Sequence, residues 1–375
     1  SLLAIPFFIL AGNIMNKGGI AIRLINLAKI VTGRTPGGLA QTNILANALF
    51  GAISGSGTAA ASAMGSIIGP IEKDEGYDPN FSAAANIATA PTGLLIPPSN
   101  VMITFSLVSG GTSVAALFMA GYIPGALWAL ACMLVVYIYA KKAGYRSQTK
   151  LTGKEKFNAF IQALPCLLLI IIVIGGIIAG VFTATEGSVV AVVYSLLLSI
   201  YGYKSMKWKD LPEIFRASAE MTGIIIFLIG VSSIMSWVMA FTNIPTMVSN
   251  GLLSISSNKY VILLMINIIL LVVGTFMDMT PATLIFTPIF LPVCTALGMN
   301  TIHFGIMLIF NLCIGTITPP VGTTLFVGVK VGGVKIETVF KHLLPYFFAI
   351  IVVLMLVTYI PQLSLWLPGL MGYVS

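Results

Sequence analysis

Helix breakers recur at one fixed spacing along this chain. The segment TAPTGLLIPPSN (residues 89–100) places a glycine, two adjacent prolines and a Ser-Asn pair inside a long apolar run, and GTITPPVG (residues 315–322) repeats the interruption 222 positions later. Because backbone geometry dictates where Gly and Pro stand, their coincidence over about 60 residues indicates an internal duplication. At this offset the aligned pairs are Thr58 with Thr280, Pro70 with Pro292, Gly76 with Gly298, Gly93 with Gly315, Pro97-Pro98 with Pro319-Pro320, and Gly110-Gly111 with Gly332-Gly333.

The composition places this duplication in a membrane. Hydrophobic residues make up 58% of the 375 positions, charged residues 8%, and the mean hydropathy is +1.02, which leaves too little polar surface for a soluble domain. The excess of 19 Lys and Arg over 11 Asp and Glu lies in loops between apolar runs, so it indicates membrane topology rather than a nucleic acid partner. The four cysteines stand singly in apolar runs, and we expect small buried side chains rather than metal ligands or disulfides.

The first half is predicted to hold short interrupted segments besides full spans. A spanning helix over residues 1–15 leads into a basic amphipathic stretch, 17–34, which we expect along the membrane surface. Two apolar pieces too short to cross the bilayer then meet at SGSG, Ser54 to Gly57, and predict a re-entrant hairpin over 37–75. The interruption at residues 89–100 predicts a broken helix over 80–108.

The second half follows the same plan after several long spans. We predict spanning helices over 113–140, 157–182, 186–203, 219–241 and 338–360, and an uncharged amphipathic stretch over 244–258. A second hairpin, 259–297, has its tip at TFMDMT, and a second broken helix covers 301–331. The predicted fold class is therefore an all-α polytopic membrane protein with two repeats.

The positive charges decide how the repeats are oriented. Placing residues 141–156 on the cytoplasmic side, with each hairpin returning to its own side, puts 18 of the 19 Lys and Arg inside and only Lys259 outside. The first hairpin then opens to the cytoplasm and the second to the exterior. Inverted repeats with corresponding Gly and Pro interruptions are typical of secondary transporters.

Interrupted backbone at membrane depth is tolerated only where it is buried or lines a cavity, because unsatisfied peptide groups in lipid are costly. In transporters such carbonyls coordinate Na⁺, a hard cation that prefers oxygen ligands. We therefore predict about two Na⁺ sites, one in each half, and substrate contacts beside them. The predicted first-site residues are Ser54, Ser56, Gly93 and Ser99; those of the second site are Gly274, Thr275, Asp278, Gly315, Thr318 and Thr323; and the predicted substrate contacts are Thr58, Asn100 and Thr280.

Charged residues outside the tips have structural interpretations. Asp278 at the second tip is a functional candidate, with a capping or structural acid as the alternative. Glu186 and Glu220 are expected to cap helix ends, while His303 and His342 are expected at the membrane interface. Since the predicted core holds no Lys or Arg, helix dipoles, hydroxyls and bound cations would hold an anionic substrate, unless Arg34 reaches in.

Two other classes of function compete with transport. An intramembrane serine hydrolase could use SGSG as its nucleophile, but the tip has no His or Lys base nearby in the predicted topology. A channel would need a continuous pore, whereas hairpins opening to opposite faces favour alternating access. A single Pro pair could also be a simple kink, and only its repetition indicates site architecture.

Several segments resemble the large membrane subunit of TRAP (tripartite ATP-independent periplasmic) transporters. They are LLAIPFFILAGNIMNKGG, GGLAQTNILANALFGAISGSGTAAASAMGS, APTGLLIPPSN, FTATEGSVVAV and GTITPPVGTT, and they follow the family order through essentially the whole chain. The resemblance implies a Na⁺-driven importer of organic acids, such as C4-dicarboxylates, sialic acid or other sugar acids, in the bacterial inner membrane. It implies no enzymatic activity.

The resemblance also implies an elevator mechanism, in which a transport domain moves against a scaffold. Its partners would be a small four-helix membrane subunit and a periplasmic substrate-binding protein, and one or two helices would precede SLLAIP. A standalone divalent-anion/Na⁺ symporter, which needs no binding protein, is the alternative. The implied domains are transport halves at 37–112 and 259–333, with scaffold segments at 1–36, 113–258 and 334–375.

Overall fold

The computed structural model describes residues 2–145 and 152–373, and every regular element in these ranges is a helix. The central part of the basic loop 141–156 lies outside the described residues. In chain order the helices are α1 (Ala4–Lys17), α2 (Ile20–Thr32), α3 (Gly38–Ser54), α4 (Gly57–Asp74), α5 (Pro79–Thr89), α6 (Thr92–Leu95), α7 (Asn100–Val108), α8 (Val114–Ala143), α9 (Gly153–Ile178), α10 (Ala184–Leu197), α11 (Leu211–Phe241), α12 (Ile244–Ile255), α13 (Lys259–Gly274), α14 (Met279–Ala296), α15 (Thr301–Gly315), α16 (Thr323–Gly332), α17 (Ile336–Tyr359) and α18 (Gln362–Leu370).

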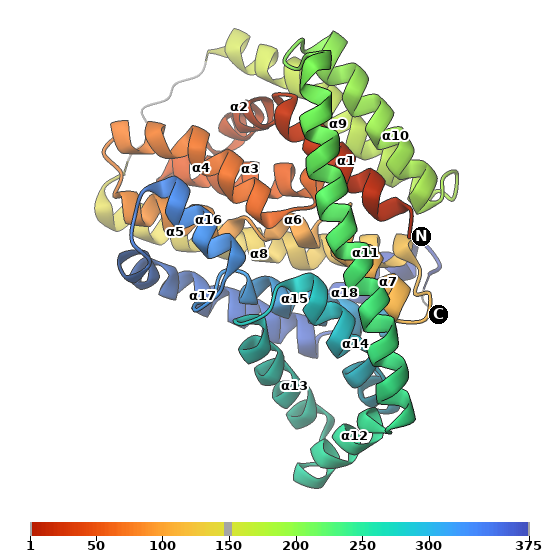
Figure 1. Cartoon of the computed structure of the whole chain (residues 1–375). Helices are drawn as coiled ribbons and strands as arrows, with labels where there is room; N and C mark the ends of the chain where they lie inside the picture. Colours follow the sequence, from red (N-terminus) through yellow and green to blue (C-terminus); the bar gives the residue numbers. More distant parts are fainter. Residues whose placement is uncertain (1, 146–151, 374–375) are drawn as a thin grey trace.

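Both predicted hairpins and both predicted broken helices are present. In the first half α3 and α4 form a hairpin whose tip is Gly55-Ser56, and α5, α6 and α7 form a helix bent by 48°. In the second half α13 and α14 form the hairpin, and α15 and α16 are separated by non-helical backbone at residues 316–322. In Figure 1 the two broken helices cross the middle of the molecule, with the first hairpin above them and the second hairpin below.

The two repeats exchange contacts in a symmetric way. Helix α4 of the first hairpin packs against α16 of the second broken helix, and α14 of the second hairpin packs against α7 of the first. The long helices continue the pattern, because α17 packs against α5 and α8 packs against α15. The structure therefore confirms the fold class: an all-α chain of inverted repeats, each with a hairpin and a discontinuous helix, as in elevator-type ion transporters.

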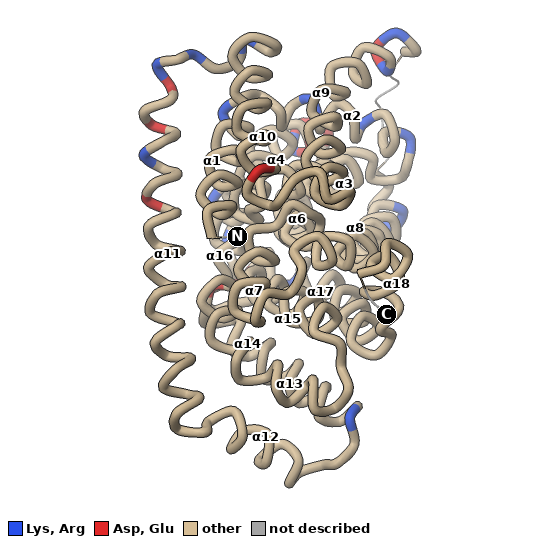
Figure 2. The backbone as a smooth tube through the Cα atoms, turned by 90° about the vertical axis from the view of Figure 1, so that its right-hand side faces the viewer, with Lys and Arg blue, Asp and Glu red and all other residues tan. Residues whose placement is uncertain are grey.

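Several helices have lengths and apolar surfaces suited to a bilayer. Six helices among the described residues are long and apolar enough to cross a membrane, or up to eight if each bent helix pair is one span. Helix α11 crosses the front of the molecule in Figure 1 and runs along its left-hand side in Figure 2, and its Phe227 is 70% exposed. Such apolar surface is unfavourable in water, so the chain is a multi-pass membrane protein.

Charge is distributed unevenly along the molecule. Figure 2 shows most of the Lys and Arg residues toward one end of the molecule, whereas α12 and α13 lie toward the opposite end. Lys259 is the first residue of α13. This arrangement agrees with the orientation predicted from the positive charges.

The basic amphipathic stretch 17–34 forms α2, which turns 74° from α1 at Gly18 and Gly19. One face of α2 packs against α3 and α9, and the buried side of that face includes Ile20 and Leu24. One face of this amphipathic stretch is therefore buried in the protein. The short helix α18 was not predicted, and α11 begins at Leu211 rather than at residue 219, because the charges of Glu213 and Arg216 interrupt the apolar run there.

Candidate functional site

The two hairpin tips meet at one cavity of about 440 Å³. Its walls come from both tips, from both broken helices, and from α1 and α11. Hydroxyl and amide groups dominate its polar lining, and Asp278 is its one charged side chain among the described residues. The lining residues are Ile9, Gly12, Asn13, Ser54, Gly55, Ser56, Gly57, Thr58, Ala59, Leu94, Asn100, Val101, Ala217, Met221, Asp278, Met279, Thr280, Thr316, Thr323 and Thr324.

The first tip presents three hydroxyl groups to this cavity. Ser56 is the N-cap of α4: its Oγ accepts a hydrogen bond from the amide of Ala59 at 3.3 Å and lies 3.1 Å from Oγ1 of Thr58. Ser54 ends α3 and donates to the carbonyl of Ser56 at 3.4 Å. Gly55 adopts a positive φ of 61°, which glycine accommodates without strain and which closes the hairpin in two residues.

The first break contains two buried polar atoms without hydrogen bond partners. Oγ of Ser99 and Oδ1 of Asn100 are buried and unpartnered, although Ser99 stands at the N-cap of α7, where a hydroxyl usually bonds to the helix amides. Buried polar atoms are normally satisfied, because an unpaired one costs free energy. Their oxygens are therefore available to a ligand.

Two helices cross at this break with direct backbone contact. A Cβ built on Gly93 would lie 2.0 Å from Cα of Gly51, which is closer than any real side chain approaches. Gly93 thus allows α6 to lie against α3, just behind the tip. This close backbone crossing brings main-chain carbonyls near the tip, and the predicted part of Gly93 in a cation site stays a prediction.

The second break repeats the glycine crossing. A Cβ on Gly315 would lie 2.5 Å from the carbonyl oxygen of Gly274, and one on Gly274 would lie 3.2 Å from Cα of Gly315. The carbonyl of Thr275 accepts from the amide of Val321 at 3.2 Å, so the extended part of the break is held against the hairpin. The hydroxyl of Thr318 donates to the carbonyl of Ile314 at 2.7 Å.

The second tip carries the acid. Oδ1 of Asp278 accepts a hydrogen bond from the hydroxyl of Thr323 at 3.2 Å, which links the tip to the start of α16. Asp278 is exposed and its side chain makes no capping bond to α14, so a capping role is wrong, whereas the bond to Thr323 agrees with the alternative of a structural acid. Thr280 follows in the first turn of α14 and lines the cavity.

The cavity brings together only some of the residues predicted to bind Na⁺ or substrate. Seven of the predicted residues line it, namely Ser54, Ser56, Thr58, Asn100, Asp278, Thr280 and Thr323. The remaining six lie behind the tips, at the two glycine crossings and the extended breaks: Gly93, Ser99, Gly274, Thr275, Gly315 and Thr318. The geometry therefore separates a space large enough for a small organic molecule from two tighter backbone sites.

Several contributors to the cavity were not predicted from the sequence, among them three polar residues and a methionine. Thr316 and Thr324 flank the second break, and Asn13 projects from α1, where it donates to Ser218 of α11 at 2.8 Å. Met221 comes from α11. The duplicate Thr in GTITPPVGTT was a usable signal, whereas nothing in the sequence links α1 or α11 to the tips.

The remaining charged residues have structural roles. Glu186 completes a reciprocal cap with Thr183 at the start of α10, which confirms the predicted capping. Glu220 instead pairs with Arg216 at 3.1 Å on the exposed face of α11, so its predicted capping role is wrong. Arg34 is exposed and does not line the cavity.

The two histidines differ from each other. His303 is buried and its Nε2 lies 2.8 Å from the carbonyl of Val357, so it joins α15 to α17 rather than facing the membrane interface. His342 is partly exposed at the start of α17, and its Nε2 lies 3.5 Å from Asp78.

The donor set fits Na⁺ better than a catalytic reaction. Hydroxyl, amide and carbonyl oxygens are the ligands of hard cations, and the unpartnered oxygens of Ser99 and Asn100 lie where the first site is predicted. At the second break the hydroxyl of Thr318 donates a hydrogen bond but keeps lone pairs for a cation. The described cavity lining includes no Lys, Arg or His that could act as a base toward a serine.

Comparison with known proteins gives the family. The model of the tripartite ATP-independent periplasmic transporter DctM component matches residues 1–363. The chain belongs to this family. The resemblance found in the sequence is thereby confirmed, and the TRAP large permease family places the chain among transporters.

Individual relatives cover nearly all of the chain. An uncharacterized protein YgiK of Salmonella typhimurium is 55% identical over 99% of this chain and 85% of its own length. The sialic acid TRAP transporter large permease protein SiaM of Vibrio cholerae is 37% identical over 100% of this chain and 87% of its own. The C4-dicarboxylate TRAP transporter large permease protein DctM of Rhodobacter capsulatus is 36% identical over 99% and 87%.

Among solved structures, the crystal structure of the Alcanivorax borkumensis YdaH transporter is similar, with a TM-score of 0.63 over 98% of this chain and 85% of that one. At 12% sequence identity this similarity concerns the fold alone.

Proposed function

We propose that this TRAP large permease is a Na⁺-coupled importer of an organic acid in the bacterial inner membrane. The observation that carries the proposal is the meeting of both hairpin tips and both breaks at one hydroxyl-lined cavity, with unpartnered oxygens at Ser99 and Asn100 beside it. Bound Na⁺ would supply the positive charge that the described lining lacks, so an acid could enter next to Asp278.

The symmetry of the two halves supports an elevator mechanism. Each hairpin packs on the broken helix of the other half, so the four units form one body that could move together against α9, α10 and α11. The large exposed apolar surface of α11 would face lipid or a partner subunit. The division into a transport domain and a scaffold stays a prediction.

The partners follow from family membership. We propose that a small four-helix membrane subunit enlarges the scaffold and that a periplasmic binding protein delivers the solute. The substrate class is an organic acid, because sialic acid and C4-dicarboxylate are named for the relatives SiaM and DctM.

Reconstitution tests this function. The full complex in proteoliposomes, with its binding protein, should take up one acid from a panel of succinate, N-acetylneuraminate and isethionate when Na⁺ is higher outside, and the uptake should saturate. Ion current without saturable uptake would contradict the proposal. Equal uptake with and without the binding protein would instead favour a standalone divalent-anion/Na⁺ symporter.

A further inference from the structure

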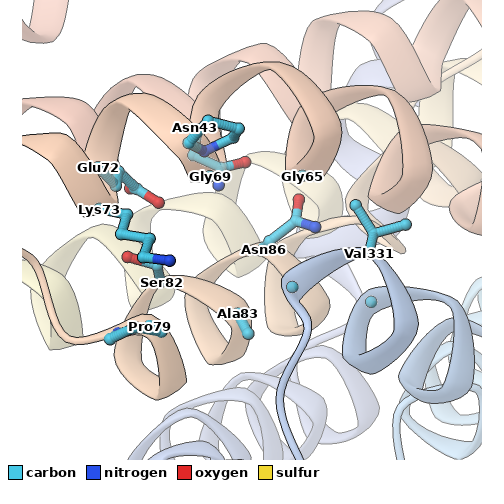
Figure 3. A pocket seen from close by; sticks show the side chains of 13 residues that line it. Asn43, Gly65, Gly69, Glu72, Lys73, Pro79, Ser82, Ala83, Asn86 and Val331 are labelled. Carbon is cyan, nitrogen blue, oxygen red and sulfur yellow. The ribbon is translucent and has the colours of Figure 1, made fainter.

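A second cavity, of about 260 Å³, lies away from the hairpin tips and shares no lining residue with the first. It forms between α3, α4, α5 and α16, beside the turn that joins α4 to α5. Figure 3 shows Glu72 and Lys73 of α4 on one side of it, Ser82 of α5 below, and Asn86 and Val331 on the other side.

Glu72 is the unusual group in this cavity. Its exposed fraction is 0%, and neither carboxylate oxygen has a partner that meets hydrogen-bond distance and angle. The Ser82 hydroxyl is the side-chain donor that acts on this carboxylate. No nitrogen of a described Lys, Arg or His lies within 4.0 Å of it. The hydroxyl of Ser82 is also buried and likewise has no partner at hydrogen-bond distance and angle. A buried ionised carboxylate without a partner is strongly unfavourable, so Glu72 requires a bound cation or a proton.

The nearby amides do not complete a metal site. The side-chain amide of Asn47 donates to Oδ1 of Asn43 at 2.8 Å and to Oδ1 of Asn86 at 3.0 Å. Asn86 in turn donates to the carbonyl of Ala61 at 2.8 Å. These bonds occupy the amides of the lining, where the oxygens of Glu72 and Ser82 remain unpartnered. A metal ion such as Ca²⁺ or Mg²⁺ takes about six oxygen ligands, whereas a proton needs one acceptor.

The titratable groups around Glu72 leave it free to bind a proton. On α4 and the following turn, Lys73 lines the cavity and Glu75 acts on Glu72 as a like charge. Burial raises the pKa of Tyr77, in the same turn, to about 12, so this phenol stays neutral. Tyr346 of α17 adds a second phenol. The lining residues that α3, α5 and α16 contribute include no titratable side chain.

We propose that Glu72 is a proton-binding site in the first hairpin, reached through this cavity and independent of the predicted Na⁺ sites. Helix α4 carries Glu72 near one end and the tip residues Gly57 and Thr58 at the other. Protonation would keep α4 packed between α3 and α16, and ionisation would draw Glu72 toward water and loosen that packing. The position of the first tip would then depend on pH.

Infrared difference spectroscopy of the purified chain tests this site without any transport assay. Between about pH 5 and about pH 9, a range that includes the documented values of buried carboxyl groups, the wild type should lose a protonated carboxyl band as pH rises. Glu72→Gln should lack that band, and Asp74→Asn, an exposed neighbour on α4, should keep it. A wild-type spectrum identical to that of Glu72→Gln at every pH would overturn the proposal.

Thermal unfolding gives a second readout. The wild type should lose stability as pH rises, because ionisation of Glu72 is unfavourable in the packed state, and Glu72→Gln should not. A carboxylate signal of Glu72 that responds to Na⁺ and not to pH would also overturn the proton assignment. In reconstituted complexes the uptake rate should change about threefold or more over this pH range, and less than about 1.5-fold in Glu72→Gln. Since the infrared signal needs no substrate, failure of uptake would leave this test intact.

Discussion

The two halves of the molecule share one backbone plan but differ in burial. At the first break Ser99 is 0% exposed, whereas at the second break Val321 is 42% exposed and Phe276, beside the second tip, is 60% exposed. Nearly every residue of α3 is buried, but only one face of α13 is.

The difference comes from what covers each hairpin. Helix α3 packs against α1, α2, α5, α6 and α8 as well as α4, while α13 packs mainly against α14 and α15. The first break therefore holds the unpartnered oxygens of Ser99 and Asn100 under close packing, whereas at the second break Thr323 is bonded to Asp278. Duplicated sequence thus specifies the same path for the chain, and the neighbours decide how open each site is.

The largest loss of stability is expected at the tighter glycine crossing, between Gly93 and Gly51. Gly93→Ala places a methyl group 2.0 Å from Cα of Gly51, where only backbone can move, so it should destabilise the protein by about 3 kcal/mol or more and abolish uptake. Thermal unfolding of the purified protein measures this. Gly223→Ala in α11, where the added methyl group meets nothing within 4 Å, is the control and should be neutral. Equal melting temperatures for the two variants would refute the close crossing.

The glycine crossing in the second half, between Gly274 and Gly315, should tolerate an added methyl group better than the crossing of Gly93 and Gly51. Gly315→Ala meets the carbonyl of Gly274 at 2.5 Å, and Gly274→Ala has 3.2 Å to Cα of Gly315. We expect losses of about 2 and about 1 kcal/mol, respectively, from the same unfolding measurement. A loss for Gly274→Ala as large as that for Gly93→Ala would mean that the two crossings are equally tight.

Removing the unpartnered hydroxyl of Ser99 should raise the stability of the Na⁺-free protein instead of lowering it. Ser99→Ala removes a buried polar atom that lacks a partner, so without Na⁺ the variant should be more stable than the wild type by about 1 kcal/mol. In the wild type Na⁺ should raise the melting temperature, and this gain should shrink in Ser99→Ala. Thr318→Val, the matched change at the second break, removes a hydroxyl that already donates a hydrogen bond and should not stabilise the Na⁺-free protein. An unchanged Na⁺ response in both variants would remove these residues from the predicted sites.

The smallest effects on the free energy of unfolding are expected at the two hairpin tips. Ser56→Ala loses a capping hydrogen bond to α4 and should cost about 1 kcal/mol of stability. Asp278→Ala loses no cap and should cost less than about 0.5 kcal/mol, while uptake falls strongly because the bond to Thr323 disappears. Unfolding and uptake measured together would separate these roles, and a stability loss for Asp278→Ala larger than for Ser56→Ala would reverse the comparison.

Much of the fold could be predicted from the sequence, because helix ends and breaks depend on local backbone chemistry. The Pro pairs, the positive-φ glycines and the short apolar pieces located both hairpins and both broken helices within a few residues. Thr183 and Glu186 likewise formed the cap that their spacing predicted. The binding of Na⁺ at Ser54, Thr275 and the other predicted residues stays a prediction.

The sequence by itself determined the membrane class, the inverted duplication and the family, since each depends on composition or on order along one chain. The tertiary structure decided which oxygens face one another: it joined Asn13 and Thr324 to the tips and paired Gly51 with Gly93. It also buried Glu72 in a separate cavity, without a positively charged partner among the described residues. The physical reason is that hydrogen bonds and burial depend on contacts between segments far apart in the sequence, whereas helix breaks depend on adjacent residues.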